Sequence, residues 1–479
     1  MTLEDTEAQP TPPTRRSLRR SSRGATAQAP ATAEALGWLD ASAVLAHAHA
    51  ARGMGVAAPP LTERTDEPDL LAEAPLRRSL RVSTVLPVAL VLIVVAAYTA
   101  TALLWPLTAV PPQIAAGQVQ PRAAAASALD WPSAGSAAAG VAGIGEPVAS
   151  TSKRAEIASI TKVVTALLVL EELPLALDEK GPEYVFTAQD QATYYSYLAS
   201  GQSALNVPVG GSLTEYQMLE AMLLASANNY ADRLALELWP TDAVYAAAAK
   251  EWLAAHDITG ITVVNPSGFD SANKAKPAAL IRLAEEALAN PVIAEIVAKE
   301  SAKIPGVGTV ENTNTLISDS GVVGVKTGTL NTYAVLTAKD VEVGETTVRL
   351  YTSVLGQKSS SARFSATRKL LAQLEEELTP FPSITAGTVA GEVTTAWGET
   401  VDVVAADDAS VVLWNEAAAV PTISVSLDGG EQKGDVVGTL TLTGPLNTDT
   451  VDLTLADDVE EPSPWWRLTH PVELFGLGT

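Results

Sequence analysis

The longest hydrophobic stretch of the chain covers residues 84–104, where 21 residues carry no charge and are largely Val, Leu, Ile and Ala. As a helix, this stretch spans about 31 Å, which matches a bilayer hydrocarbon core of about 30 Å. The pattern therefore predicts a transmembrane helix at residues 84–105. Because about 80 residues precede it, far more than precede the apolar core of a cleavable signal peptide, we expect it to remain as an anchor.

Basic residues on either side of this helix predict its orientation. Arg77, Arg78 and Arg81 lie just before it, and the next basic residue after it is Arg122. Positive charge stays on the cytoplasmic side, so the N-terminus is predicted to be cytoplasmic and the rest extracytoplasmic, in a single-pass protein of the cell membrane. Residues 1–83, rich in Ala, Pro, Ser, Thr and Arg, read as a mostly disordered tail. Residues 106–128, rich in Pro and Ala, read as an extracytoplasmic linker.

Two apolar patterns of helical period follow the linker. Residues 163–170 are apolar almost all round, which is typical of a helix buried on every side. A second helix is predicted with Ser212 as its N-cap and Glu215 three residues later, as in a capping box. Its apolar stripe consists of Met218, Leu219, Met222 and Leu223.

Strand-like patterns dominate the C-terminal half. Residues 322–329, 333–338 and 347–355 are β-rich segments separated by short turns, which predicts an antiparallel meander. Residues 381–479 are rich in Val, Thr, Asp and Gly and alternate at 439–443 and 450–455, so a small β-rich domain is expected there. Near the end, Trp465-Trp466-Arg467 fits either a membrane interface or packing of the tail onto a domain.

Composition and charge narrow the functional classes. The 479 residues, 47% hydrophobic and 5% aromatic, suffice for two or three domains with buried cores. Residues 1–83 contain 10 Arg and 10 acidic residues, so the whole net charge of −24 belongs to the rest of the chain. So acidic a surface repels nucleic acid, and no nucleic-acid partner is expected. Because cysteine is absent, the chain has no disulfide, thiolate nucleophile or Cys-based metal site.

Three short motifs occur in order: Ser159-Ile160-Thr161-Lys162, then Ser226-Ala227-Asn228, then Lys326-Thr327-Gly328. Ser159 opens the buried helix, where the helix dipole favours developing negative charge. Lys162 lies one turn later on the same face, and burial favours its neutral, basic form, so the pair reads as an activated serine. Ser226-Ala227-Asn228 follows the second helix, where it either aims polar groups into a cleft or merely ends the helix. By contrast, Ser271-Ala272-Asn273-Lys274 has the first motif's spacing without its context.

The order and separation of the three motifs resemble the set shared by penicillin-binding proteins and serine beta-lactamases. Residues 265–269, 312–314 and 357–378 extend the resemblance to the D-alanyl-D-alanine carboxypeptidase branch, the low-molecular-mass penicillin-binding proteins, over about residues 130–380. The resemblance implies an α+β fold for residues 129–380, with a five-stranded antiparallel sheet flanked by helices and a helical cluster beside it.

The resemblance also implies a reaction, removal of the terminal D-Ala from peptidoglycan stem pentapeptides through a Ser159 acyl-enzyme, without a cofactor. Lys162 would accept the serine proton, and Ser226 and Lys326 would relay a proton to the leaving amine. Asn228 would orient the peptide, and the strand would bind its terminal carboxylate. The backbone N–H groups of Ser159 and Thr329 would form an oxyanion hole. Beta-lactams would be covalent inhibitors. The residues that the resemblance assigns to substrate binding are Asn228, Thr327, Gly328 and Thr329, with Lys326 also on the carboxylate.

Several alternatives stay open. Asn229 stands where many relatives carry an acid. A beta-lactamase of class A would need an E-x-x-L-N loop between Asn228 and Lys326, and the sequence has none. A transpeptidase, an endopeptidase, or an inactive wall-binding scaffold on the same fold would keep the same motifs. Zinc peptidase and Ser-His-Asp chemistry fit poorly, because the exported part has only His256 and His470.

Overall fold

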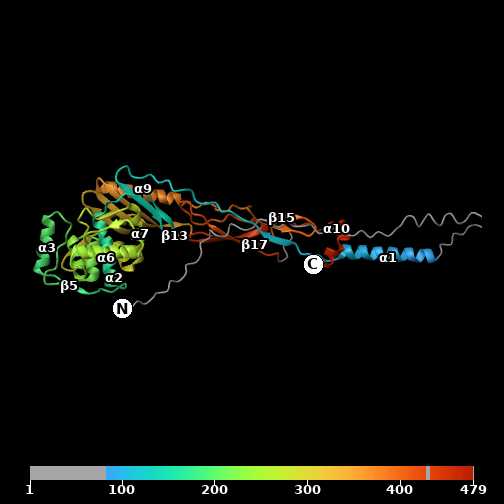
Figure 1. Ribbon diagram of the computed structural model, residues 1–479, viewed down its shortest axis with the longest axis horizontal. Helices are drawn as coiled ribbons and strands as arrows, with labels where there is room; N and C mark the ends of the chain where they lie inside the picture. Colours follow the sequence, from blue (N-terminus) through green and yellow to red (C-terminus); the bar gives the residue numbers. More distant parts are fainter. Residues whose placement is uncertain (1–81, 428–431, 478–479) are drawn as a thin grey trace, which may run out of the picture. The chain divides into compact units, whose positions relative to one another are not determined.

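The computed structural model describes residues 82–427 and 432–477, so the predicted tail at residues 1–81 lies outside the described residues (Figure 1). The expected apolar helix is present as α1 (Val82–Leu104). Within it, Val85–Leu104 has a mean hydropathy of 2.3, and this helix is long and apolar enough to cross a membrane.

A five-stranded antiparallel sheet forms the centre of the predicted catalytic domain, in the order β11-β12-β13-β2-β3. The fold expected for this part of the chain is therefore confirmed. Turns at residues 330–332 and 344–345 connect the last three strands of the chain order, as the sequence predicts. The strands are β2 (Ser136–Val141), β3 (Ile144–Ala149), β11 (Val322–Thr329), β12 (Tyr333–Val343) and β13 (Thr346–Gln357).

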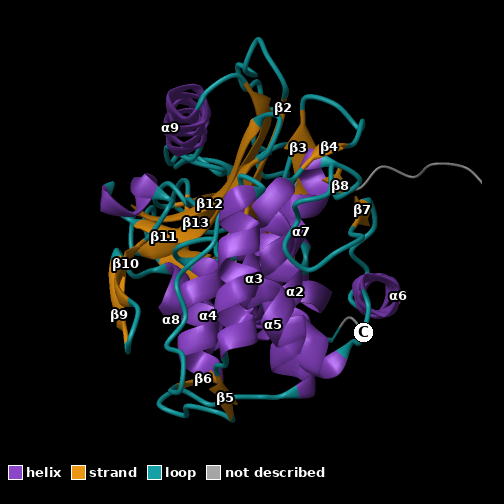
Figure 2. Cartoon of the chain, turned by 90° about the vertical axis from the view of Figure 1, so that its left-hand side faces the viewer, coloured by secondary structure: helices purple, strands orange, loops and turns teal. Residues whose placement is uncertain are grey.

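Side chains on the two faces of this sheet contribute to two different hydrophobic cores. On β12, Leu336 and Ala338 enter the core of the helical cluster, whereas Val335 packs with residues of α9 (Ser360–Glu377). Helix α7 (Pro277–Ala289) packs on the first face and α9 on the second. Figure 2 shows these two helices on opposite sides of the sheet. Successive residues of β12 are therefore buried on alternate faces, as expected for a sheet that helices cover on both sides.

The helical cluster surrounds α2 (Thr161–Glu172), in which residues 161–170 are all buried, as the apolar pattern predicts. The other helices are α3 (Ala188–Ala199), α4 (Glu215–Leu223), α5 (Asn228–Leu238), α6 (Asp242–Ala255) and α8 (Pro291–Val297). Short strands connect them: β4 (Ala155–Glu156), β5 (Glu183–Val185), β6 (Ser212–Thr214), β7 (Ile261–Thr262), β8 (Lys274–Ala275), β9 (Ser301–Ile304) and β10 (Gly308–Glu311).

The predicted start of the second helix is wrong by two residues. Ser212 does not cap α4, because it lies in β6, which pairs with β5. Thr214 is the N-cap instead, and it forms a capping box with Gln217. Pairing with a distant strand thus overrides a local capping signal of the same kind.

A six-stranded antiparallel sheet forms the expected β-rich C-terminal part, in the order β1-β14-β15-β18-β17-β16. Its first strand comes from the segment expected to be a linker, because β1 (Gln113–Ala116) pairs with β14. Residues 106–128 are therefore not a simple spacer. The remaining strands are β14 (Val389–Thr394), β15 (Thr400–Ala405), β16 (Val420–Val425), β17 (Val436–Thr443) and β18 (Thr448–Leu455).

Polar and apolar contacts join α9 to this β-rich part. The Trp414 indole N–H donates to Glu377 Oε2 at 2.7 Å, and the Ser127 hydroxyl donates to the same oxygen at 2.7 Å. Trp414 is buried in one core with Leu374 and Leu378. The buried Trp414 ring and its hydrogen bond to Glu377 therefore hold α9 against the β-rich part.

The chain ends in two short helices, α10 (Pro464–Thr469) and α11 (Pro471–Leu474). The structure shows this segment in contact with α1. Tyr98 donates to the Leu468 carbonyl at 2.7 Å, and Arg467 donates to the Trp105 carbonyl at 2.8 Å. Trp465 stays 74% exposed.

Candidate active site

Ser159 lies in the single turn of 3-10 helix η2 (Ala158–Ile160), directly before α2. Ala158 has a φ of 45°, in the left-handed region. Gly268 lies against this residue, because a Cβ on it would be 2.0 Å from the Ala158 carbonyl oxygen. The nucleophile predicted from the sequence therefore sits at the start of a buried helix, next to a residue that packing holds in an uncommon conformation.

Lys162 is fully buried, and its amine contacts three oxygen atoms. Nζ lies 2.9 Å from Ser159 Oγ, 2.6 Å from Asn228 Oδ1 and 2.6 Å from the Ser267 carbonyl oxygen. The last two oxygens are acceptors only. A neutral amine has two N–H bonds, which these two carbonyls occupy, and one lone pair, which then accepts the Ser159 hydroxyl hydrogen. This is the geometry of a serine with a general base in place.

The electrostatics favour the neutral amine. Burial lowers the pKa of Lys162 from 10.5 to about 7, and the nearby carboxylate of Asp232 opposes this by raising it. Burial also lowers the pKa of Lys326 well below its usual value, and the positive charges of Lys162 and Arg363 lower it further. The lysines of the first and third motifs thus come close enough in the fold to repel each other.

The second motif lies in the turn between α4 and α5, as predicted. Ser226 has a φ of 61° and is 6% exposed, and Asn228 begins α5. The Asn228 amide is engaged on both sides, since its Oδ1 accepts from Lys162 and its Nδ2 donates to Gln202 Oε1 at 2.8 Å. Asn228 therefore positions the lysine, a contact that the sequence-based assignment to substrate binding did not include.

The third motif lies on β11, and the structure brings it to the first motif. A Cβ on Gly328 would lie 2.3 Å from the Ile157 carbonyl oxygen, so only glycine allows β11 to approach η2 this closely. Lys326 and Thr327 are buried beside Thr313. Thr327 Oγ1 is 2.8 Å from Thr313 Oγ1, and the Lys326 amine donates to that oxygen at 3.4 Å.

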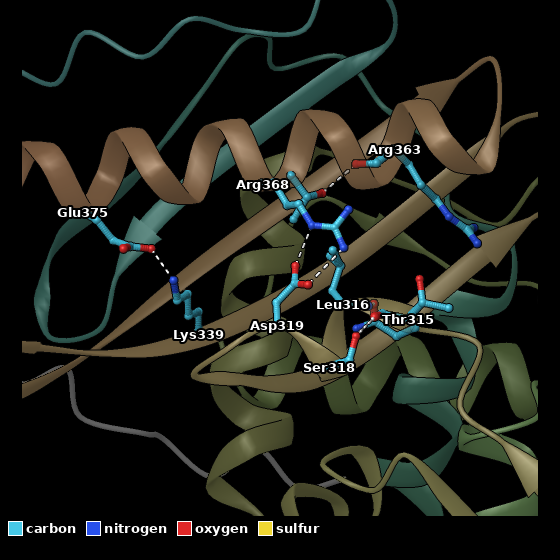
Figure 3. A network of polar contacts seen from close by, with 10 residues as sticks. Thr315, Leu316, Ser318, Asp319, Lys339, Arg363, Arg368 and Glu375 are labelled. Atoms are coloured by element: carbon cyan, nitrogen blue, oxygen red, sulfur yellow. Dashed lines mark hydrogen bonds and ion pairs between the residues drawn. The ribbon is translucent and has the colours of Figure 1, made fainter.

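Arg363 is a residue of this site that the sequence reasoning missed. It is 6% exposed, and its Nη1 donates to the Gly328 carbonyl at 3.0 Å and to Thr329 Oγ1 at 3.1 Å. Figure 3 shows Arg363 near the start of α9. The ion pairs Arg368–Asp319 and Lys339–Glu375 join this helix to neighbouring parts of the chain. A sequence signal exists, because Arg363 occupies the first position of a buried stripe whose later members are Thr367, Leu370, Leu371 and Leu374.

Four further residues complete the surroundings of Lys162: Gln202, Ser267, Asp232 and Tyr197. Ser267 lies in the segment 265–269 that carries part of the resemblance, whereas no local pattern marks Gln202 or Asp232. In the part of the chain that the structure describes, no group of three or more His, Cys, Asp or Glu is placed to hold a metal ion.

A family model described as D-alanyl-D-alanine carboxypeptidase matches residues 149–359. The matched segment contains all three motifs. The structure places Lys162 of the first motif in contact with Asn228 of the second, and Gly328 of the third against Ile157, two residues before Ser159. This segment is therefore similar to D-alanyl-D-alanine carboxypeptidases. Arg363 lies just beyond the residues that the family model matches.

Among curated proteins, the D-alanyl-D-alanine carboxypeptidase DacB2 of Mycobacterium tuberculosis is 32% identical over 184 residues. The alignment covers 36% of this chain and 58% of that protein, so the chain spans somewhat over half the length of this carboxypeptidase.

Solved structures of similar proteins include a peptidoglycan synthesis regulatory factor (PBP3) from Streptococcus pneumoniae, at 23% identity and a TM-score of 0.47, covering 68% of this chain and 99% of that one. Penicillin-binding protein D2 from Listeria monocytogenes, in the ampicillin-bound form, has 23% identity and a TM-score of 0.41, covering 50% of this chain and 96% of that one.

Replacing Gly328 with Ala should disrupt the candidate site without reaching any side chain that is predicted to be catalytic. The new methyl group would meet the Ile157 carbonyl at 2.3 Å, so β11 and η2 must separate. A displacement of about 1 Å between reacting groups lowers rates about 100-fold, and we expect a loss of this order in the rate of covalent labelling by penicillin. Gly211→Ala, whose nearest contact would be 3.3 Å, is the control. An unchanged labelling rate in Gly328→Ala would contradict this close approach.

Proposed function

We propose that this protein is a serine D-Ala-D-Ala carboxypeptidase that removes the terminal D-Ala from peptidoglycan stem pentapeptides. The observation that carries the proposal is the contact of the buried Lys162 amine with Ser159 Oγ at 2.9 Å, while two carbonyl oxygens occupy its N–H groups. The family match of residues 149–359 supports the substrate class.

In the acylation step, Ser159 Oγ attacks the carbonyl carbon of the penultimate D-Ala, and its proton passes to the lone pair of Lys162. The tetrahedral oxyanion is stabilised by the backbone N–H groups of Ser159 and Thr329, where one such donor contributes about 2.7 to 4 kcal/mol. Ser226 and Lys326 relay the proton that Lys162 took up to the departing amine nitrogen, so the C–N bond breaks and D-Ala leaves. Water then attacks the ester carbonyl and gives its proton to Lys162, which returns it to Ser159 Oγ as the ester C–O bond breaks.

Recognition of a free carboxylate is assigned to the end of β11. Lys326, Thr327 and Thr329 supply polar groups there, and Arg363 adds a buried guanidinium next to Thr329. Burial lowers the pKa of Arg363 to about 10, which leaves it charged at neutral pH. A charge-assisted hydrogen bond of this kind contributes roughly 1.5 to 3 kcal/mol, enough to favour peptides with a free C-terminus.

The test uses the full-length protein, purified in detergent micelles. Release of D-Ala is measured from a synthetic stem pentapeptide ending in D-Ala-D-Ala, and from the same peptide with a C-terminal amide as the matched control. Separately, the protein is labelled with a fluorescent penicillin, and mass spectrometry of its proteolytic fragments locates the adduct. We expect D-Ala release from the free peptide, at least about tenfold slower release from the amide, and a long-lived adduct on Ser159.

Each alternative reading gives a different result. Rapid loss of the label with turnover of penicillin would identify a beta-lactamase. Transfer of the peptide to an added amine acceptor in place of hydrolysis would identify a transpeptidase. Absence of both label and D-Ala release would reject the enzymatic proposal and leave a wall-binding scaffold.

Substitution of Arg363 by Gln tests the carboxylate site. We expect kcat/KM for the free peptide to fall about 10- to 100-fold, because the charged donor beside Thr329 is lost. The much smaller rate on the amidated peptide should change little, so selectivity falls. Arg368→Gln on the same helix serves as the control, because Arg368 is about half-exposed and pairs with Asp319 instead of contacting Thr329. Equal losses on both peptides would argue for a structural role of Arg363 instead.

Localisation at the cell membrane is also proposed, with α1 as a single-pass anchor and the N-terminus in the cytoplasm. The length and hydropathy of α1 support the anchor, and the arginines that precede it in the sequence support the orientation. Protease added outside intact cells should then remove the catalytic part while leaving an N-terminal tag intact. Loss of the N-terminal tag would contradict this orientation.

A further inference from the structure

Asp232 is a half-buried residue, with its Oδ1 atom fully buried, beside the proposed catalytic centre, and the mechanism above has no role for it. It lies on α5, one turn after Asn228, so both side chains leave the same face of the helix. Asn228 contacts the Lys162 amine at 2.6 Å, and Asp232 Oδ2 accepts a hydrogen bond from the Tyr197 hydroxyl of α3 at 2.5 Å. Together with Tyr197 it lines a small cavity against α5.

The site around this carboxylate is rich in basic side chains. Lys162, Lys326 and Arg363 bring up to three positive charges into one buried region. Among the described residues, none of the three forms an ion pair with a carboxylate. The carboxylate that acts on Lys162 is that of Asp232, which is too far away to form an ion pair with it.

We propose that Asp232, held by Tyr197, is a positioning residue that sets the proton affinity of the Lys162 amine from a distance. A carboxylate in direct contact with Lys162 would keep the amine charged and unable to accept the serine proton. Asp232, which lies one helical turn after Asn228 on α5 and makes no ion pair with Lys162, partly offsets the repulsion from Lys326 without capturing the proton. The inference rests on the proposed function only in giving Lys162 the role of base.

The direction of the effect follows from the groups that face Asp232. Tyr197 of α3 and Asp242 and Tyr245 of α6 lie near it, and Lys162 of α2 faces it from the catalytic side. Burial raises the pKa of Asp232, whereas the hydrogen bond from Tyr197 and the charge of Lys162 lower it. Because the ionised carboxylate raises the pKa of Lys162, removing its charge should lower that pKa further.

The experiment measures the titration of Lys162 directly, without depending on catalysis. The full-length protein in detergent micelles is labelled with carbon-13 at the lysine Cε atoms, and the Lys162 signal is assigned with Lys162→Arg. In Asp232→Asn we expect the titration midpoint to fall by about one pH unit. In Tyr197→Phe it should fall by less, because loss of the hydrogen bond only makes Asp232 easier to protonate.

Glu237→Gln is the matched control, because it removes one carboxylate from the same helix and that carboxylate is half-exposed and paired with Arg233. Its Lys162 midpoint should not move. If the enzyme is active, the acid limb of penicillin acylation should move to lower pH in Asp232→Asn by the same amount. A packing role for Asp232 alone would change the rate or the melting temperature but not these midpoints.

An unchanged or raised midpoint in folded Asp232→Asn would overturn the inference. Should that variant fail to fold, an unchanged midpoint in Tyr197→Phe would do so instead. If Asp232→Asn lowers the Lys162 midpoint but the wild-type protein neither releases D-Ala nor binds penicillin, the proposed function is rejected and the role of Asp232 is kept. The two ideas therefore fail on different measurements.

Discussion

Ser159→Ala is expected to abolish covalent labelling by penicillin and release of D-Ala from the stem pentapeptide, with no adduct detected at any pH. Acylation forms a bond to Ser159 Oγ, and an alanine has no atom there. The loss should come without unfolding, because Ser159 is only partly buried and the variant removes a single oxygen atom. Its melting temperature should stay within a few degrees of that of the wild type.

The chain contains its own matched control. Ser271 and Lys274 have the same spacing as Ser159 and Lys162, but both are exposed, and Lys274 lies in the short strand β8. Ser271→Ala should therefore label at the wild-type rate. Comparison of the two variants tests whether a serine becomes nucleophilic through burial and contact with lysine, or merely through the spacing of Ser and Lys in the sequence. Residual labelling of Ser159→Ala at a comparable rate would assign the acyl group to another residue.

Local pattern was sufficient for the elements that carry the site. The helix behind Ser159 was predicted because residues 163–170 are apolar almost all round, and α2 is indeed buried along residues 161–170. The meander was predicted because three β-rich segments are separated by short turns, and these segments are β11, β12 and β13. In each case the signal lies within a dozen residues, which is the range over which periodicity reports burial.

Predictions failed where a distant strand decides the structure. Ser212 has the residue type of an N-cap, but pairing with β5 places it in β6. Residues 113–116 have the composition of a linker, but an open edge of the C-terminal sheet takes them up as β1. Backbone hydrogen bonds to a partner far along the chain leave no trace in the local sequence, so neither outcome was visible beforehand.

The candidate site divides in the same way. Ser159, Lys162, Ser226 and Lys326 were assigned because their motifs have a fixed order in the sequence. Their surroundings, by contrast, come from positions outside the three motifs: Gln202 after α3, Asp232 within α5 and Arg363 within α9. The roles proposed for Asp232 and Arg363 arise only once the fold brings these residues to the motifs. A buried arginine on an otherwise apolar or neutral helix face was the one signal that could have been found.

Lys162→Met should lower the rate of acylation by about 100- to 10,000-fold, which is the usual contribution of a general base. Methionine fills a similar volume but offers no lone pair of comparable basicity to the Ser159 hydroxyl. In the wild type the rate should rise about tenfold per pH unit below about pH 7, because protonated Lys162 cannot accept the serine proton and its pKa lies there. The residual rate of the variant should lack this acid limb.

A stability change should accompany the loss of the amine. Asn228 Oδ1 and the Ser267 carbonyl oxygen each lose their donor at 2.6 Å, and a buried acceptor left without a partner costs about 1 to 3 kcal/mol. The melting temperature of Lys162→Met should therefore fall by several degrees, whereas Lys274→Met at the exposed decoy should change neither rate nor stability. Kinetics of fluorescent penicillin labelling from pH 5 to 9, with thermal unfolding, measure both. Labelling of Lys162→Met within tenfold of the wild type, or with the same acid limb, would remove Lys162 from the role of base and point to another proton acceptor near Ser159.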